Sequence, residues 1–564
     1  MDQLDATFFR AVTAFLLQLA VLSGLGWAAP RWVRRLSGRP LTEAEALALG
    51  VAAPAALGYV AFWLYFASPP AGRLFSWFTL AATAITLAVG LGSGRPRSRL
   101  RGSLALLTGL AGLFYVGALF IFPAGDFSAT AGARYLSGLP ADNQIPGYFA
   151  ARLYDGNAEK SFGGDWLESD RPPLQTGIVL LTMPALRVGG WSDDASSSAA
   201  GVWFELLWIP SVAVFLRWLG ATDREAVSGC AGLAFTGFFL FHSVFVWPKL
   251  GGGALMLLAF SLFFPAPGGT ETGAARRCRG ALAGGLAALA ALAHGGLLFS
   301  LLALAVLALA APRRAAAWRV AAVAFLVIYS PWIAYQRLCA PPGNRLIKWH
   351  IAGAIPPDAR SVGETLRENY RAQGWAKSWA ARRANLATVL HGGWGADLGW
   401  RTGPSGDIRR VNEWYYSLHA PGWWLAGLAA LPWLAFRGGA ASAWRGRGRE
   451  QALAIAWLGL TLGLWVALMF FPNSTVVHQG SFAVELVLLG LLAAWALFAG
   501  RAFFLGLFFL QAAHFAVTWL PASDGKTVPA ARAPELVCAA GALALVGLLI
   551  ANLRRDAAAT PLGV

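Results

Sequence analysis

Apolar residues occur along this chain in runs of about 17–25, and each run is long enough to cross the hydrocarbon core of a bilayer as a helix. Short polar segments, many of them rich in arginine, separate the runs. We therefore predict an all-α polytopic membrane protein with about 15 transmembrane helices. The predicted spans lie near residues 8–28, 46–67, 74–92, 103–123, 200–218, 226–245, 250–265, 281–294, 295–311, 317–334, 415–436, 450–471, 480–499, 501–519 and 533–553.

Arginines cluster in connections between these runs, as is typical of segments retained in the cytoplasm. With the predicted spans and an N-terminus outside, every cluster falls on the cytoplasmic side. The clusters are Arg31–Arg39, Arg95–Arg101, Arg276–Arg279, Arg313–Arg314, Arg437–Arg449 and Arg554–Arg555.

One apolar run, Leu174 to Leu186, is not counted as a span. It is short, contains Pro184 and is closed by Arg187, and counting it would place every later arginine cluster outside. We expect an amphipathic helix that lies on the outer surface or dips into it. The topology then leaves two large outer loops, at residues 124–199 and 335–414.

The composition agrees with a membrane location. Hydrophobic residues make up 57% of the chain and charged residues 13%, against about 25% charged in an average soluble domain. The net charge of +17 comes almost entirely from loop arginines, which argues against nucleic acid as a partner. The four cysteines have no paired spacing, so we expect neither a zinc site nor a disulfide framework.

Acidic and basic side chains gather in the first outer loop. A carboxylate can take the proton of an acceptor hydroxyl in a glycosyl transfer. A lipid phosphate that leaves as an anion needs cations rather than a general acid. Asp142 and Asp170 are therefore the catalytic candidates. The substrate-binding candidates in this loop are Arg171, Asn143 and Asp165.

The motifs around these residues resemble those of glycosyltransferases of the GT-C fold, especially the aminoarabinose transferase and protein O-mannosyltransferase families. In the former, an acidic pair opens the first outer loop, followed by Gly-Asp-Trp and an acidic-basic-Pro-Pro-Leu motif. Asp142 matches the first acid, and the resemblance implies that it is the base. Asn143 replaces the second acid, a departure from a two-carboxylate mechanism. Asp170 and Arg171 match the acidic-basic step, which implies that Arg171 binds the lipid phosphate.

The resemblance covers about residues 100–350. It implies a catalytic transmembrane core at residues 103–334, preceded by a three-span extension at 1–102. A second outer loop at 335–414 and C-terminal helices at 415–564 follow. The Leu174–Arg187 run would be the surface helix of that fold.

A purely structural role is the alternative for both acids. Asp142 would then cap a helix over Gln144–Leu153. Asp170 would cap a helix that starts at Pro172, since proline favours the first helical turn.

Further polar residues near the outer ends of spans are substrate-binding candidates: Lys249, His294, Arg345, Lys348 and His478. Lys249 either faces the site or snorkels to the interface. His294 either binds phosphate or holds a tight turn. Arg345 and Lys348 alternate with apolar residues, as in a segment that touches lipid headgroups, and a capped turn is the alternative for His478.

These features predict an inverting glycosyltransferase that moves a sugar from a polyprenyl-phosphate or polyprenyl-diphosphate donor to a lipid, glycan or protein acceptor. The cytoplasmic connections are too short for a nucleotide-sugar-binding domain, and motifs of nucleotide hydrolases, zinc peptidases and serine hydrolases are missing. We therefore expect a lipid-linked donor, used at the outer face of a bacterial plasma membrane without a metal or other cofactor.

Two other functions remain open. An O-antigen polymerase or ligase shares the donor type but centres on Arg and His in a later outer loop. A lipid or sugar transporter or flippase predicts inverted repeats and helices broken by Gly or Pro near mid-membrane. We find neither in the sequence, although Pro54 and Pro210 interrupt spans.

The topology can be tested by reporter fusions or cysteine labelling. We expect positions near 160 and 380 to be outside and positions near 275 and 445 to be inside, because arginine-rich connections stay in the cytoplasm. Positions 160 and 380 on opposite faces would show that Leu174–Arg187 spans the membrane.

Overall fold

The computed structural model describes most of the chain as helices joined by turns, with no β-strand in the described part. The described residues are 3–92, 98–135, 141–157, 167–265, 272–311, 315–341, 343–356, 359–391, 410, 413, 419–436, 446–472, 482–523 and 532–558.

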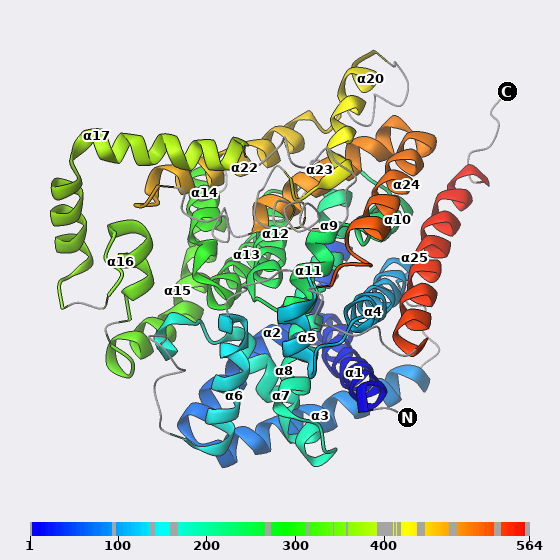
Figure 1. The fold of residues 1–564 in the computed structure, drawn as a ribbon, viewed down its shortest axis with the longest axis horizontal. Coiled ribbons are helices and arrows are strands. Elements are labelled where there is room, and N and C mark those ends of the chain that lie inside the picture. The colour runs from blue at the N-terminus through cyan, green and yellow to red at the C-terminus, as the bar shows by residue number, and fades with distance from the viewer. Residues whose placement is uncertain are drawn as a thin grey trace.

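The helices of the N-terminal half include those of the first predicted outer loop, α5, α6 and α7, which lie in the lower half of the view in Figure 1. In chain order they are α1 (Gln3–Ser37), α2 (Glu43–Ala67), α3 (Pro69–Gly92), α4 (Arg99–Phe120), α5 (Phe127–Arg134), the 3₁₀-helix η1 (Ala141–Gln144), α6 (Ile145–Asp155), η2 (Glu168–Asp170), α7 (Leu174–Val188), α8 (Asp193–Glu205), α9 (Trp208–Trp218), α10 (Asp223–Leu233), α11 (Gly237–Phe245) and α12 (Lys249–Phe263).

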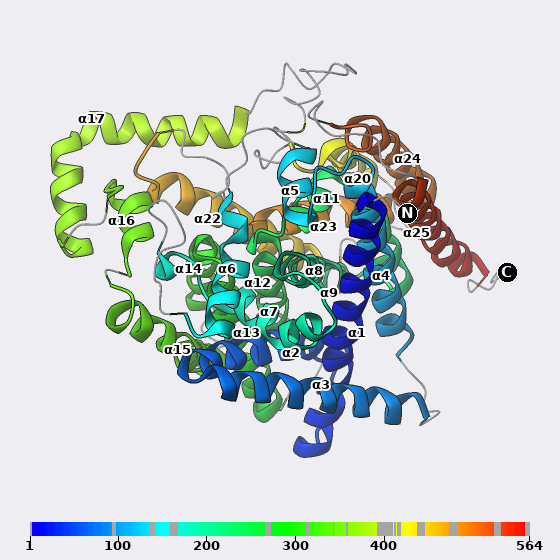
Figure 2. The same cartoon turned by 60° about the horizontal axis from the view of Figure 1, so that its bottom comes forward.

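The helices of the C-terminal half include the long α17, which bends at Gly374 and forms one edge of the molecule, far from α25 (Figures 1 and 2). In chain order they are α13 (Gly273–Ala293), η3 (Gly295–Leu297), α14 (Leu298–Leu309), α15 (Ala315–Leu338), α16 (Arg345–Ala352), α17 (Val362–His391), η5 (Gly422–Ala429), α20 (Ala430–Phe436), α22 (Gly448–Leu468), α23 (Ala483–Ala499), α24 (Arg501–Thr518) and α25 (Arg532–Ala558).

In the described residues, nine helices are long and apolar enough to cross a membrane, and the bent pair α10–α11 makes ten if it is one span. These ten account for the predicted spans before 250, the span near 317–334 and the spans near 450–471, 501–519 and 533–553. The remaining predicted spans form helices that are shorter or carry arginines. The prediction of an all-α, multi-pass membrane protein is confirmed, whereas the count of 15 and the GT-C fold stay predictions.

Polar residues define where several spans begin. Thr42 and Glu45 form a capping box at the start of α2, in which the Thr42 hydroxyl accepts from the Glu45 N–H and the Glu45 carboxylate accepts from the Thr42 N–H. Thr222 and Glu225 do the same at the start of α10. These caps satisfy N–H groups that the first helical turn leaves without partners.

The expectation of a surface helix at Leu174–Arg187 is wrong. Helix α7 packs against α2, α3, α6 and α8 (Figure 2), and residues 171–184 are all buried within the protein. Gln18 of α1 donates to Thr182, and Ser76 of α3 donates to the Leu180 carbonyl. Helices α2, α3, α6 and α8 therefore bury this segment, with a further contact from α1. The sequence did not predict its burial, because its apolar run matches a buried helix as well as a surface one.

Two glycines set the distance between α2 and α7. A Cβ atom on Gly177 would lie 2.0 Å from the Gly58 carbonyl oxygen, and one on Gly58 would lie 2.9 Å from the Ile178 nitrogen. Small residues at such a crossing let two helix backbones approach closely.

A break between α10 and α11 bends this stretch by 76°. It falls at residues 234–236, which contain neither glycine nor proline. We predicted no broken helix from the sequence, and α11 separates this break from the turn that leads into α12.

A substitution at the glycine crossing tests the packing of α7. Gly177→Ala should cost about 1–3 kcal/mol, because the added methyl group overlaps backbone atoms that cannot move aside without separating α2 from α7. The measurement is thermal unfolding of the purified protein in detergent.

Gly459→Ala in α22 is the control, because a Cβ atom there meets nothing within 4 Å. It should leave stability unchanged or raise it by up to about 1 kcal/mol, through helix propensity. Equal losses in the two variants would contradict the close crossing.

Candidate functional site

Segments far apart in the sequence meet in one buried, charged cluster. The first outer loop contributes η1 and the residue after η2, and the beginning of α12 contributes Lys249. The turn after α13 contributes His294, and α16 from the second outer loop contributes Arg345. Each of these segments lies at a span end, or in a loop, that the arginine pattern places outside.

Asp142 and Arg171 form an ion pair at the centre of this cluster. Their side chains are only 9% and 7% exposed, respectively. Helix α6 begins after Gln144 without a side-chain cap, so Asp142 is not the N-cap that we considered as its alternative role. Its second carboxylate oxygen, Oδ1, is buried and has no hydrogen-bond partner in the described structure, which leaves a lone-pair acceptor for a ligand.

A second ion pair lies beside the first. Arg345 Nη1 is 2.9 Å from Asp170 Oδ2, and both side chains are almost fully buried. Asp170 also accepts from the Leu167 N–H at 3.0 Å, so it holds η2 and not the start of α7, whose N-cap is Pro173. Burial raises the pKa of Asp170, and the Leu167 N–H and Arg345 act against that shift.

Lys249 brings another cation to the cluster. Its ammonium nitrogen lies 3.5 Å from the centre of the Trp247 ring, and its side chain is 1% exposed. It interacts electrostatically with Asp142, Arg171 and Glu205. Snorkelling to water, the alternative role that we considered for Lys249, is therefore wrong.

Two histidines face the same positive charges. His294 Nδ1 accepts from the Gly296 N–H at 3.0 Å, so its alternative role in a tight turn is confirmed. His350, at the end of α16, interacts with Lys249 and Arg171. Burial and these two cations lower the pKa of His350 to about 4, so this ring is neutral at pH 7 and adds no charge to the cluster.

Amide side chains support the turn ahead of Lys249. Asn143 donates to the Phe245 carbonyl at 2.8 Å, and Gln175 donates to the Val246 carbonyl at 3.0 Å. Val246 has φ 54°, a left-handed conformation that a β-branched residue adopts only under constraint. The first outer loop therefore holds the turn that positions Lys249.

A cavity of about 280 Å³ opens beside Asn143. Its lining combines carboxylates, amides, serines and the half-exposed ring of Tyr148, and no lysine or arginine is among the described residues that line it. Gln175 is 2% exposed, and its Oε1 atom has no hydrogen-bond partner in the described structure. Hydrogen-bond acceptors thus dominate this cavity, in contrast to the cation-rich cluster next to it.

The structure unites most of the residues expected from the sequence. Asp142, Asp170, Arg171, Lys249, His294 and Arg345 lie in the cluster, and Asn143 joins it to the cavity. Lys348 is buried on α16, one turn after Arg345. Asp165 and His478 lie outside the described residues.

Sequence reasoning missed Glu205, Gln175 and His350. Glu205 Oε2 accepts from the Gly251 N–H at 2.8 Å in the first turn of α12, next to Lys249. It is the one acidic residue in the apolar run 200–218, and ionisable residues inside spans point to function. Gln175 lies in the apolar run that we assigned to the outer surface. His350 lies close in the sequence to Arg345 and Lys348, which were the stronger cationic candidates.

Chemically, the cluster combines a carboxylate with several buried cations. Cations held in place without water stabilise an anion strongly, and a carboxylate beside them can accept a proton from a neighbouring hydroxyl. No group of three or more His, Cys, Asp or Glu side chains with metal-site geometry occurs among the described residues.

The fold and this cluster define an all-α, multi-pass membrane protein with a buried charged site at one end of its spans. Comparisons of the chain with protein-family models, curated proteins and solved structures find no match.

The Arg345–Asp170 pair makes a prediction about stability. Arg345→Leu should cost about 3–5 kcal/mol, because it leaves a buried carboxylate without its cation. Arg345→Leu with Asp170→Asn should recover part of that loss. The measurement is unfolding of each purified variant in detergent.

Arg360→Leu serves as the control, since Arg360 pairs with Glu368 at the surface. Its cost should stay within about 1 kcal/mol. A similar small cost for Arg345→Leu would show that Asp170 does not depend on its partner.

Proposed function

We propose that this protein is a membrane glycosyltransferase that transfers a sugar from a polyprenyl-phosphate or polyprenyl-diphosphate donor to an extracytoplasmic acceptor. The observation that carries the proposal is the buried pairing of Asp142 with Arg171, next to Lys249. One carboxylate and two cations are the groups that a displacement at a sugar phosphate requires.

The cations would hold the phosphate of the donor. Arg171 offers a planar set of N–H donors that matches phosphate oxygens, and Lys249 supplies a compact positive charge. When the bond between the anomeric carbon and the phosphate oxygen breaks, the electron pair stays on the phosphate. Fixed cations in a water-poor site stabilise this developing charge without having to reorganise.

Asp142 would act as the base. The acceptor hydroxyl gives its proton to the carboxylate while its oxygen attacks the anomeric carbon, which inverts the configuration there. Binding of the donor phosphate brings a second anion to Arg171, which weakens its hold on Asp142. The free Oδ1 atom supports this role, since it leaves the carboxylate an acceptor position for the proton. The cavity lined by Asn143, the next residue in the chain, would hold the acceptor molecule nearby.

The membrane setting supports a lipid-linked donor. The cluster lies at span ends that the arginine pattern places outside, in a bacterial plasma membrane. A long prenyl chain would remain in the bilayer while its phosphate reached the site. The resemblance of the first-loop motifs to those of GT-C glycosyltransferases also supports the proposal, and the proposed reaction requires neither a metal nor an organic cofactor.

Two observations favour other functions. The 76° break between α10 and α11 is a feature of transporters, in which broken helices surround the substrate. Arg345 and His350 come from the second outer loop, where an O-antigen polymerase or ligase would keep its site. Transfer of label to a product separates the enzymes from a transporter or flippase, which would move the donor unchanged.

Asp142→Asn tests the proposed base. Asn cannot accept the acceptor's proton, so transfer should fall by at least about a hundredfold. Asp142→Glu keeps the charge and should retain more activity than Asn. The assay is transfer of radiolabelled sugar from a polyprenyl-phosphate donor to a membrane extract by the purified protein, with melting temperature measured in parallel.

Asp155→Asn is the matched control, because Asp155 is a carboxylate of the same loop that pairs with Arg187 at the surface. It should keep the activity of the original protein. A folded Asp142→Asn variant with normal turnover would remove Asp142 as the base.

A further inference from the structure

The second half of α17 exposes large apolar side chains, although it belongs to a predicted outer loop and not to a span. Trp375 is 82% exposed, Trp379 54% and Leu386 46%, and the two tryptophan rings stack with their centres 6.1 Å apart. We call these three residues the apolar stripe. Exposed apolar groups that lie together mark a surface that contacts a partner or a membrane.

The apolar stripe occupies one side of the helix. Successive residues turn by about 100° around a helix axis, which places the three stripe residues within about 40° of one another. Ala381, Asn385 and Val389 are buried and form a second side, centred about 100° from the stripe. The exposed Lys377 lies on a third side, about 180° from the stripe. The buried side therefore lies between an apolar side and a polar side.

The buried side attaches this helix to the end of a span. Asn385 donates to the Met469 carbonyl at 3.2 Å, and Arg382 donates to the same carbonyl. Val389 belongs to a small apolar cluster with Phe299 and Met469. Met469 directly follows α22, and Phe299 lies at the beginning of α14, and both of these ends are predicted to be outside. The second half of α17 thus lies at the predicted outer boundary of the membrane.

The charged residues of the same half are all basic. Residues 375–391 contain Lys377, Arg382 and Arg383 and no aspartate or glutamate. Arg383 is exposed and lies about 60° from the centre of the apolar stripe. Tryptophan and leucine on one side of a helix, with basic residues on the others, are typical of helices that lie in a membrane interface.

The first half of α17 is polar, and its exposed residues include Glu364, Arg367, Glu368 and Arg371. The halves meet at Gly374, whose φ of 71° favours glycine. Figures 1 and 2 show the second half along one edge of the molecule, while the first half runs toward α16. The bend therefore separates a polar half from a half that carries the apolar stripe.

We propose that the second half of α17 lies in the outer leaflet of the membrane, with the apolar stripe among the upper parts of the acyl chains. Arg383 lies at the level of the lipid phosphates, and Lys377 faces water. The bilayer is the occupant that the surroundings supply, because α22 crosses it and the stripe adjoins the side that rests on the end of α22. An interfacial helix buries its apolar face about 5–10 Å into the boundary between headgroups and acyl chains.

This contact with lipid also supports the candidate site. Asn369, in the first half of α17, donates to the Ala352 carbonyl at 2.7 Å, where α16 ends. Helix α16 begins with Arg345, the partner of Asp170. The lipid surface thus holds the loop that brings Arg345 to the cluster. The inference does not depend on the proposed glycosyl transfer.

The test places single fluorescent labels on the apolar stripe. Trp379→Cys and Leu386→Cys are made in a chain that carries Cys278→Ser and Cys339→Ser, because the other two cysteines are buried. Each variant is labelled with bimane and reconstituted in nanodiscs of phosphatidylglycerol and phosphatidylcholine. We expect both labels to lose more fluorescence to lipids that carry a nitroxide near the headgroup than to iodide in the water. A nitroxide at the end of the acyl chain should quench them less.

Lys377→Cys is the matched control, because it is an exposed position of the same helix on the side opposite the stripe. Its label should lose more fluorescence to iodide than to the lipid nitroxides. If iodide quenched the stripe labels as strongly as this control, the stripe would face water and the proposal would be overturned. Protection of the stripe labels from both quenchers would overturn it in favour of cover by protein, such as a second copy of the chain.

The melting temperature of each variant in detergent reports whether it folds. All three variants should melt close to the original protein, because the replaced side chains are exposed. Trp375→Cys supplies a third stripe position if one of the others unfolds. Loss of folded protein at all three stripe positions would contradict their exposure and would overturn the proposal.

Discussion

Two arginine–aspartate pairs, Arg171–Asp142 and Arg345–Asp170, lie almost wholly out of water, and each charge loses hydration that its partner, neighbouring charges and nearby dipoles offset. The pairs therefore tie the two outer loops to each other and to the span ends beneath them. Adjacent residues, Asp170 and Arg171, belong to different pairs. If either pair opened, a charge would be left uncompensated beside the other, so η1, η2 and α16 depend on one another for their positions.

The same constraint explains the turn ahead of α12. Lys249 can be buried because carboxylates on both sides interact with it and because Trp247 offers its ring face. The left-handed Val246 stays in place because amides of the first outer loop hold the carbonyls around it. The packing that places Lys249 in the cluster thus also forms part of the wall of the adjoining cavity. The contacts that stabilise this turn are therefore the same ones that position Lys249 in the candidate site.

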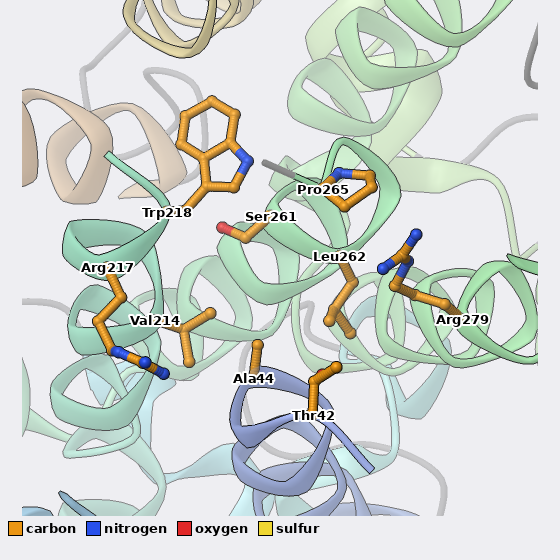
Figure 3. A pocket seen from close by; sticks show the side chains of 9 residues that line it. All are labelled: Thr42, Ala44, Val214, Arg217, Trp218, Ser261, Leu262, Pro265 and Arg279. Carbon is orange, nitrogen blue, oxygen red and sulfur yellow. The ribbon is translucent and has the colours of Figure 1, made fainter. Parts of the chain in front are cut away.

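The two ends of the helix bundle use positive charge differently. At the candidate site the cations are buried, paired and few, which suits a single phosphate that enters and leaves a defined position. At the other end the arginines are numerous and partly exposed, and two of them, Arg217 and Arg279, border the pocket between α2, α9, α12 and α13 (Figure 3). Exposed arginines there are the basis of the predicted topology, since such residues are typical of segments retained in the cytoplasm.

The sequence by itself determined the membrane class, most span positions and nearly all the charged members of the site, because hydropathy and side-chain chemistry are local properties. It could not decide that α7 is buried, since its apolar run suits a membrane surface and a protein interior equally. Nor could it decide the pairings. Arg171 meets Asp142 across 29 positions, and Arg345 meets Asp170 across 175. Such partners, the bend between α10 and α11 and both cavities follow from packing between distant segments, which only the tertiary structure brings together.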